Sequence, residues 1–389
     1  MHEYFHKALE ALPTLARFAF CMMLIVIIPR LSRCVRLPEV VGLLLAGVLF
    51  GPHVLDVFPT QHPVLRFFSE VGMLLLMFFA GLEIDLALFR QKIFRSLGFG
   101  VVTTSLPLLL GTLVTFWIGY DLLPALVVGS LLASHTMLGS NIVARLGARR
   151  LEPMVVTTGA TLVSDTLALL VFAVCVPMYA SGFSVSGITI QVVEIVVFVP
   201  LMLFGLGRAG EHLLRRVEDE EETYFILMFG ILAVTALLAE RINLPGIVGT
   251  FLAGLAVNAA VKDKPAKHKL EFIGNTLFIP IFFIVTGFMI DPFELIRTIS
   301  QDYLLALGII GALIVGKWLA SEICGRAFGY GTAARRTMWS LTLPQVAATL
   351  AAKLVAYRTF NADGQPLLDA RMLNAVLIMV LVTAILGPV

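Results

Sequence analysis

Charged residues are scarce in this sequence. Only 14% of its 389 residues are Asp, Glu, Lys or Arg, whereas 59% are hydrophobic, and soluble globular proteins carry about 25% charged residues. This composition excludes an ordinary water-soluble fold, because a chain of this length cannot hide so much apolar surface in its own core. The net charge of +2 gives no indication of nucleic-acid binding. We therefore expect an all-α membrane protein surrounded by lipid.

Cysteine and histidine are also sparse. Cys21, Cys34, Cys175 and Cys324 lie in or beside apolar segments without paired spacing, which argues against a disulfide framework and against a zinc site. No second His or Cys stands at ligand spacing from His135, so that side chain is more typical of a hydrogen-bonded core residue than of a metal ligand. We expect no cofactor and no enzymatic activity.

Apolar stretches of about 20 residues recur along the whole chain, the length that crosses a hydrocarbon core of about 30 Å. We predict thirteen transmembrane helices joined mostly by short turns, and no soluble domain. The one strongly charged linker is residues 208–222, and we interpret its acidic run, 218–222, as a solvated loop face. The predicted spans are 14–34, 38–56, 64–84, 96–118, 121–144, 153–178, 187–207, 223–240, 245–260, 272–290, 303–324, 336–356 and 371–388.

Lysine and arginine are distributed unevenly between the connections. The loops after odd-numbered spans hold nineteen of them and the loops after even-numbered spans hold five. Because basic loops stay in the cytoplasm, we predict a multi-pass protein of the cell inner membrane with its N-terminus outside and its C-terminus inside. We also expect the chain to continue past Val389 into a regulatory cytosolic domain.

Two pairs of segments reveal an internal repeat. Residues 37–47 (LPEVVGLLLAG) match 244–254 (LPGIVGTFLAG), and 81–85 (GLEID) match 287–291 (GFMID). The offset is nearly constant, and an odd number of spans separates the copies, so the two copies run in opposite directions. Inverted repeats are common in secondary transporters, whose site lies at the repeat interface. The predicted division is a first repeat at 14–178, a linker helix at 187–207 and a second repeat at 223–388.

Asp165 lies about halfway along the sixth span. A carboxylate at that depth costs about 2.5–3.5 kcal/mol on insertion scales, and ionisable groups there are functional by default. Hard monovalent cations prefer oxygen ligands, and the Ser164 and Thr136 hydroxyls could join Asp165 around Na⁺ or K⁺. The alternative is a structural Asp that locks two helices together.

Spans 5 and 12 are unusual for membrane helices. Span 5 contains Ser134, His135 and Asn141, and span 12 contains Pro344 and Gln345. Proline removes a backbone donor and clashes with the preceding turn, and broken backbone at membrane depth lines a cavity or is buried in protein. We predict two discontinuous helices that cross near the buried carboxylate. Span 5 taken alone could instead be a small-residue packing face.

A few other charged residues lie in or at the ends of spans. Lys317 could snorkel to the inner surface, or its ammonium could face Asp165 and be displaced by the cation. Glu83 and Asp85 end span 3, and Asp291 ends span 10. These three acids could gather cations at the inner and outer mouths, although charged helix ends are also ordinary.

Together these features resemble the monovalent cation:proton antiporter superfamily, in its second branch of bacterial sodium/proton and potassium/proton antiporters. The resemblance covers essentially the whole chain and rests on Gly81-Leu82-Glu83, Ser164-Asp165, Gly316-Lys317 and the two broken helices. It implies a dimerisation panel, a core domain that moves like an elevator, and a homodimer in the membrane. The family's ion-binding aspartate maps onto Asp165 and its core lysine onto Lys317.

One position departs from the family pattern. Members carry Asp, Asn or Gln before the binding aspartate, where this chain has Ser164. An Asp there is associated with electrogenic exchange and with a salt bridge to the lysine, which Ser164 cannot form. The resemblance therefore leaves stoichiometry and the choice between Na⁺ and K⁺ open.

The resulting hypothesis is an antiporter in which cation and proton compete for Asp165. The strongest alternative is a sodium-coupled organic anion symporter on a related inverted-repeat fold, which would need a large central cavity. A channel would need a selectivity filter, and an intramembrane aspartyl protease would need a second carboxylate at the same depth. The sequence shows neither.

Overall fold

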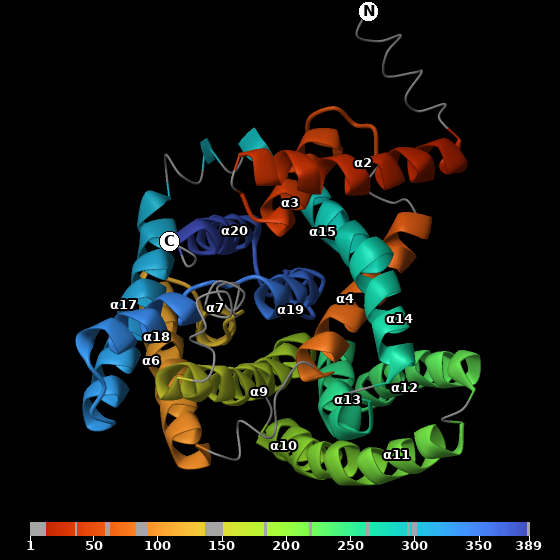
Figure 1. Ribbon diagram of the computed structural model, residues 1–389. Coiled ribbons are helices and arrows are strands. Elements are labelled where there is room, and N and C mark those ends of the chain that lie inside the picture. The colour runs from red at the N-terminus through yellow and green to blue at the C-terminus, as the bar shows by residue number, and fades with distance from the viewer. Residues whose placement is uncertain are drawn as a thin grey trace, which may run out of the picture.

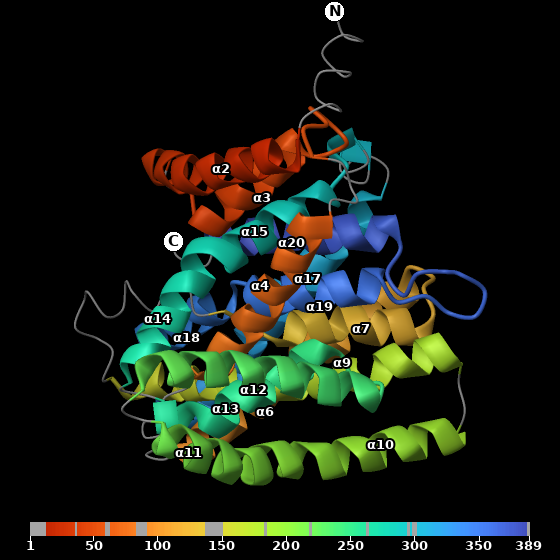
Figure 2. The same ribbon diagram turned by 90° about the vertical axis from the view of Figure 1, so that its right-hand side faces the viewer.

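The computed structural model describes residues 13–35, 37–58, 63–82, 92–136, 151–182, 185–217, 220–261, 264–293, 296–297 and 302–386. These residues form a bundle of helices (Figures 1 and 2). The helices are α2 (Thr14–Cys34), α3 (Glu39–Phe50), α4 (Pro63–Leu82), α6 (Ile93–Trp117), α7 (Leu122–Ala133), α9 (Glu152–Ser181), α10 (Val185–Pro200), α11 (Gly207–Arg216), α12 (Glu221–Arg241), α13 (Gly246–Val261), α14 (Pro265–Ile273), α15 (Ile279–Phe288), α17 (Tyr303–Ala327), α18 (Thr332–Thr342), α19 (Ala347–Tyr357) and α20 (Ala370–Leu386). Two π-helical segments, η2 (Leu201–Leu206) and η3 (Gly274–Phe278), join α10 to α11 and α14 to α15.

Within the described residues, eight helical stretches are long and apolar enough to cross a membrane, and five shorter apolar helices accompany them. Helices suit a lipid solvent because each satisfies its own backbone hydrogen bonds. The expectation of an all-helical membrane protein is confirmed. Every predicted span overlaps one or more of these helices, although the count of thirteen crossings stays a prediction.

The charged linker differs from the predicted connection between spans. Residues 208–216, predicted to belong to that connection, belong to the helix α11. This helix continues from α10 through the π-helical η2, so the helical rod is longer than the predicted span 187–207. Apolar residues between the charges allow Gly207–Arg216 to keep one face against the bundle, where Leu214 is buried.

The helices lie in successive layers. In both views α2 and α3 form one edge, α10 and α11 form the opposite edge, and α7, α9, α19 and α20 lie between them (Figures 1 and 2). Helix α6 packs against α7, α9 and α17, and α19 packs against α7, α9, α4 and α20. This arrangement brings the fifth, sixth, eleventh and twelfth predicted spans together in the interior.

Two closely packed helix pairs involve the repeated sequence motifs. Helix α3 packs on α15, and α13 packs on α4. A Cβ added to Gly47 or Gly287 would collide with the backbone of the opposite helix, and the same is true of Gly81 and Gly254. Small residues allow membrane helices to approach this closely. The reciprocal pairing, in which each copy of one motif meets a copy of the other, supports the internal repeat.

Candidate functional site

The site is built around α9, which carries Asp165 at its middle. The helix begins with Glu152 and Pro153, residue types that suit a first turn. It ends at Gly182, whose φ of 84° is a left-handed conformation that glycine adopts without strain. The apolar run between these signals places Asp165 about halfway along the helix, as the sequence predicts.

The Asp165 carboxylate is held from one side. Ser134 Oγ donates a hydrogen bond to its Oδ1 at 2.7 Å, and the His135 backbone N–H donates to the same oxygen at 3.3 Å. The described residues give Oδ2 no hydrogen bond, and the side chain is only half-buried. The carboxylate therefore keeps one oxygen available to a proton or a cation.

Both donors lie where a helix has ended. Helix α7 stops at Ala133 and residues 134–136 are not helical. Helix α18 stops at Thr342, and α19 starts only at Ala347, so the predicted break at Pro344 is confirmed. The Thr136 backbone N–H donates to Pro344 O at 2.8 Å, which joins the two non-helical segments directly. Because the second half of predicted span 5 lies outside the described residues, a crossing of two broken helices stays a prediction.

The carbonyl groups at the end of α7 are satisfied by side chains from other helices. A helix C-terminus leaves its last carbonyls without intrahelical donors. Gln345 Nε2 lies 3.4 Å from Leu132 O, and Thr349 Oγ1 lies 3.2 Å from Leu131 O and 3.1 Å from Gln345 Oε1. Gln345, predicted to line the broken helix, thus ties the non-helical segment before α19 to α7 beside the carboxylate.

Lys317 supplies the next donor. Its ammonium donates to Ala133 O at 2.7 Å and to Thr103 O at 3.0 Å. The Thr103 carbonyl lacks its usual helical partner because the residue four positions later, Pro107, has no N–H. Gly316 contacts Pro107 so closely that a Cβ would collide with the proline ring and backbone. The Gly316-Lys317 pair thus fits the kink in α6 and fills the acceptors that it leaves.

This geometry excludes one of the two predicted positions of Lys317. The side chain is fully buried, so the snorkelling alternative is wrong. It also makes no ion pair with Asp165 among the described residues, although Ala133, which it caps, directly precedes the serine bonded to that carboxylate. Its role as a direct charge partner stays a prediction, while its role as a helix cap is observed.

His135 and Ser164 form a small polar network beside the carboxylate. His135 Nδ1 lies 3.1 Å from Ser164 Oγ, and its Nε2 lies 3.0 Å from Thr161 Oγ1. Both ring nitrogens therefore have partners in a fully enclosed position. This fits the expected hydrogen-bonded core histidine. Ser164 turns toward this ring and toward Thr161 O, so its predicted role as a cation ligand has no contact in its support.

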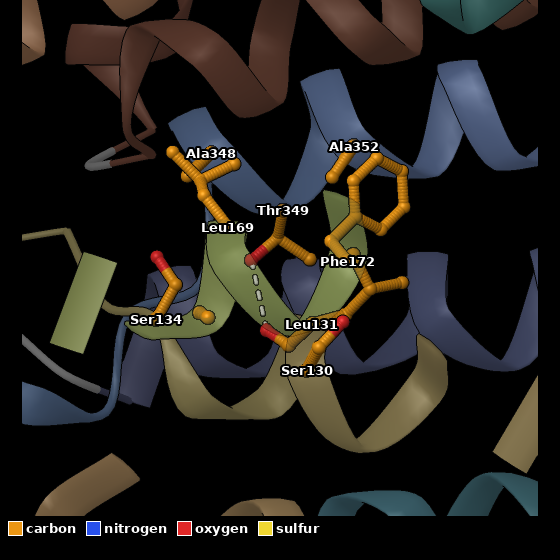
Figure 3. A pocket seen from close by; sticks show the side chains of 9 residues that line it. Ser130, Leu131, Ser134, Leu169, Phe172, Ala348, Thr349 and Ala352 are labelled. Carbon is orange, nitrogen blue, oxygen red and sulfur yellow. Dashed lines mark hydrogen bonds between the residues drawn. The ribbon is translucent and has the colours of Figure 1, made fainter. Parts of the chain in front are cut away.

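A cavity of about 10 Å³ lies next to Ser134, between α7, α9 and α19. It has room for about one water molecule. Figure 3 shows its lining, in which apolar side chains surround the hydroxyl groups of Ser130, Ser134 and Thr349. On the α19 side it is lined by Ala348, Thr349 and Ala352.

The remaining predicted residues lie elsewhere. Asn141, Glu83 and Asp85 fall outside the described residues. Asp291 lies just past the end of α15, where its Oδ2 is 3.6 Å from His53 Nδ1, and it contacts no residue of the site by a described hydrogen bond. No cluster of three or more His, Cys, Asp or Glu that could hold a metal ion occurs in the described part of the chain.

Sequence reasoning missed two features of the site region. Thr161 was not singled out, because a threonine in a membrane helix commonly bonds to its own backbone, as Thr161 also does. Lys353 was not considered, although a lysine inside an apolar span is a clear signal. It is fully buried in α19.

Comparison with known proteins places the chain in a family. Residues 20–389 match the family model described as "Sodium/hydrogen exchanger, transmembrane", and the chain belongs to this family. The fold is similar to that of the sodium proton antiporter MjNhaP1 from Methanocaldococcus jannaschii, with a TM-score of 0.75, 16% sequence identity and coverage of 96% of each chain.

Named relatives agree with the family. The chain is 40% identical to "Na(+)/H(+) antiporter NhaS5" of Synechocystis sp. over 95% of its length, and spans 53% of that relative. It is 26% identical to "Probable Na(+)/H(+) antiporter 3" of Methanocaldococcus jannaschii over 86% of each chain. It is 25% identical to "K(+)/H(+) antiporter 1" of Saccharomyces cerevisiae, over 85% of this chain and 42% of that one. The antiporter resemblance found in the sequence is confirmed, as is the expectation of a transporter family rather than an enzyme family.

Proposed function

We propose that the protein exchanges a monovalent cation, Na⁺ or K⁺, for protons across the cell inner membrane. The observation that carries the proposal is Asp165 itself, a mid-helix carboxylate whose Oδ1 accepts from Ser134 and the His135 N–H, while Oδ2 receives no hydrogen bond from the described residues. The names of the relatives support it, since they include Na⁺/H⁺ and K⁺/H⁺ antiporters. The ions are cargo, and the exchange needs no cofactor.

The chemistry follows from the cost of an uncompensated charge. A carboxylate at membrane depth is costly unless a proton or cation neutralises it. Asp165 binds either a proton or a cation, so one must leave before the other can bind. The empty, charged carboxylate does not cross the membrane barrier, so the two ions are exchanged. The Ser134 hydroxyl, which donates to the carboxylate, also has lone pairs that can face a dehydrated cation. Thr136 and the non-helical carbonyls beside it supply further oxygen ligands.

The proposal also covers the arrangement of the helices and their movement during exchange. We infer that thirteen helices form two inverted repeats of six with a linker helix, and that a core containing α7, α9, α17 and α19 moves like an elevator against a panel that dimerises. The N-terminus would lie outside and the C-terminus in the cytoplasm. The reciprocal glycine contacts of α3–α15 and α4–α13 support the repeat.

The organic anion symporter remains the alternative from another substrate class. Pockets for small organic molecules usually measure about 300–1,000 Å³. The enclosed cavity lined by Ser134, the hydroxyl donor to Asp165, holds about 10 Å³, which suits a water molecule or a bare ion better than an organic anion.

Proteoliposomes test the proposal. The wild-type chain should move protons in response to gradients of Na⁺, K⁺ or Li⁺, compared with and without a membrane potential to give ion choice and stoichiometry. Asp165→Asn should abolish exchange while eluting as an intact protein. Asp302→Asn, the same chemical change in a residue that pairs loosely with Arg371, is the matched control and should keep exchange. Retained exchange in Asp165→Asn, or sodium-driven uptake of an organic anion by the wild type, would contradict the proposal.

A further inference from the structure

A second fully buried lysine lies on α19. Lys353 has 0% exposure, and its Nζ has no hydrogen-bond partner among the described residues. Lys317, equally buried, donates to two carbonyls. The contrast matters because burying an ammonium without a partner is costly. A lysine can remove that cost by releasing its proton, whereas an arginine cannot.

The position of Lys353 relates it to the ion site. It follows Thr349 by four residues, so the two side chains lie on the same side of the helix, about one turn apart. Thr349 contacts the end of α7 and lines the small cavity together with Ser134, the donor to Asp165 (Figure 3). Lys353 is therefore the next polar group along α19 beyond this cavity.

The surroundings of Lys353 hold few other charges. Helix α7, which packs against α19, has no titratable side chain. The other helices packed against α19 carry these titratable residues: Glu152, Asp165, Cys175 and Tyr179 on α9, Arg66 and Glu70 on α4, and Arg371 on α20. Helix α19 itself adds Tyr357, and its C-cap is Arg358. Arg66, Glu70 and Arg358 pair with one another, and Glu152 pairs with Lys92 and Arg95. Asp165 is the carboxylate among them for which the described residues form no ion pair.

We propose that Lys353 is a second proton-binding residue of the exchange, whose charge in the protonated state weakens cation binding at Asp165. The inference rests on the proposed function. Proton and cation then compete in two ways, by sharing Asp165 and by repulsion between the Lys353 ammonium and the bound cation. Two unit charges about 10–15 Å apart at an effective dielectric of about 20 change a binding constant roughly five- to fifteen-fold.

Two variants separate the charged and neutral forms. Lys353→Met is neutral at every pH, and Lys353→Arg is charged at every pH. The measurement is the apparent KM for Na⁺ and for K⁺ in proteoliposomes across about pH 6 to about pH 9. Lys353→Met should lower KM at the acidic end about five- to fifteen-fold and match the wild type at the alkaline end. Lys353→Arg should match the wild type at the acidic end and raise KM at the alkaline end by a similar factor.

The results of these measurements distinguish failure of the Lys353 inference from failure of the proposed exchange function. If the wild type does not exchange ions, the proposed function fails. If the wild type exchanges ions and Lys353→Met keeps the wild-type KM at every pH, Lys353 is a neutral packing residue and this inference is overturned. A purely structural role would change the melting temperature but not the pH dependence of KM. Should Lys353→Arg not fold, the acidic end of the Lys353→Met profile decides alone.

Discussion

The scaffold and the site of this protein are built on opposite principles. The scaffold contacts come in two related copies, α3 on α15 and α4 on α13, each with a glycine from both helices at its closest point. The polar site occurs once. Helix α9 carries Asp165, whereas α20, its counterpart in the proposed repeat, has no acidic residue. The helix contacts therefore occur twice, and the buried carboxylate occurs in one of these two helices.

This difference separates two kinds of side-chain role. Residues of the scaffold act through shape, so their replacement should change stability and leave the ion dependence alone. Residues of the site act through hydrogen bonds and charge, so their replacement should change the ion dependence as well. Four sets of variants test this separation.

The largest effect is expected from Lys317→Met. The change leaves Thr103 O and Ala133 O without their donor, and each buried acceptor left unpaired costs about 1–3 kcal/mol. Stability should therefore fall by about 2–6 kcal/mol, with loss of exchange, measured by thermal unfolding in detergent and by flux. Lys353→Met is the matched control, because it leaves no described acceptor unpaired, and it should unfold near the wild-type temperature. Equal losses in both variants would contradict the capping role of Lys317.

Scaffold glycines should give the next largest change. Gly81→Ala and Gly47→Ala each place a Cβ against the backbone of the facing helix, and such overpacking costs about 1–3 kcal/mol. Because the two contacts are formed by the same pair of sequence motifs, the two losses of stability should be similar, with the Na⁺/K⁺ preference unchanged. Gly230→Ala on α12, where a Cβ meets nothing within 4 Å, should instead stabilise by about 0.5–1 kcal/mol. A shifted ion preference in either scaffold variant would erase the distinction from the site.

Ser134→Ala should act on the site with little effect on the fold. It removes the 2.7 Å hydrogen bond to Asp165 Oδ1, and a hydrogen bond to a charged group contributes about 1.5–3 kcal/mol. The Ser134 hydroxyl stabilises the ionised carboxylate, which is the form that binds a cation. Removing this hydrogen bond therefore strengthens proton binding relative to cation binding. The apparent KM for the cation at fixed pH should rise about tenfold. Ser130 lines the same cavity, and within the described residues its hydroxyl bonds only to Val127 O, so Ser130→Ala should keep the wild-type KM.

The sequence predicts those features of the candidate site that follow from a single residue. Asp165 at mid-span and the break at Pro344 each follow from the cost of a charge or of a missing donor in lipid, and both lie where expected. The repeat is also visible, because its motifs carry the glycines on which the helix contacts depend.

Directions of side chains were harder to predict than their depths. Ser164 and Asp165 are adjacent in sequence, but neighbouring helical residues point about 100° apart. Ser164 therefore meets the His135 ring while Asp165 meets Ser134. Lys317 donates to the carbonyls of Thr103 and Ala133. The first lacks a helical donor because of Pro107 in α6, and the second because α7 ends there. Such partners come from helices distant in the chain, and no local pattern records them.

The smallest effect on stability, and the sharpest test of the comparison, is expected at Glu70. Arg358 at the end of α19 donates to Glu70 of α4 at 3.0 Å, so this ion pair joins the site to the scaffold. Exposed pairs contribute about 0–1 kcal/mol, and Glu70→Gln should barely move the melting temperature. If the core moves against the scaffold during exchange, the pair must break, and the variant should change the maximal exchange rate.

Glu39→Gln provides the control for that change. Glu39 pairs with Arg33 between α2 and α3, at 2.7 Å and entirely within the scaffold. Its loss should also have a small effect on stability, because this pair is even more exposed than Arg358–Glu70. It should have no effect on the rate, because its two helices need not move apart. A rate change in Glu70→Gln alone would show that the single-copy site moves as a body against the duplicated scaffold. Unchanged rates in both variants would mean that the α4–α19 contact stays closed throughout the exchange cycle.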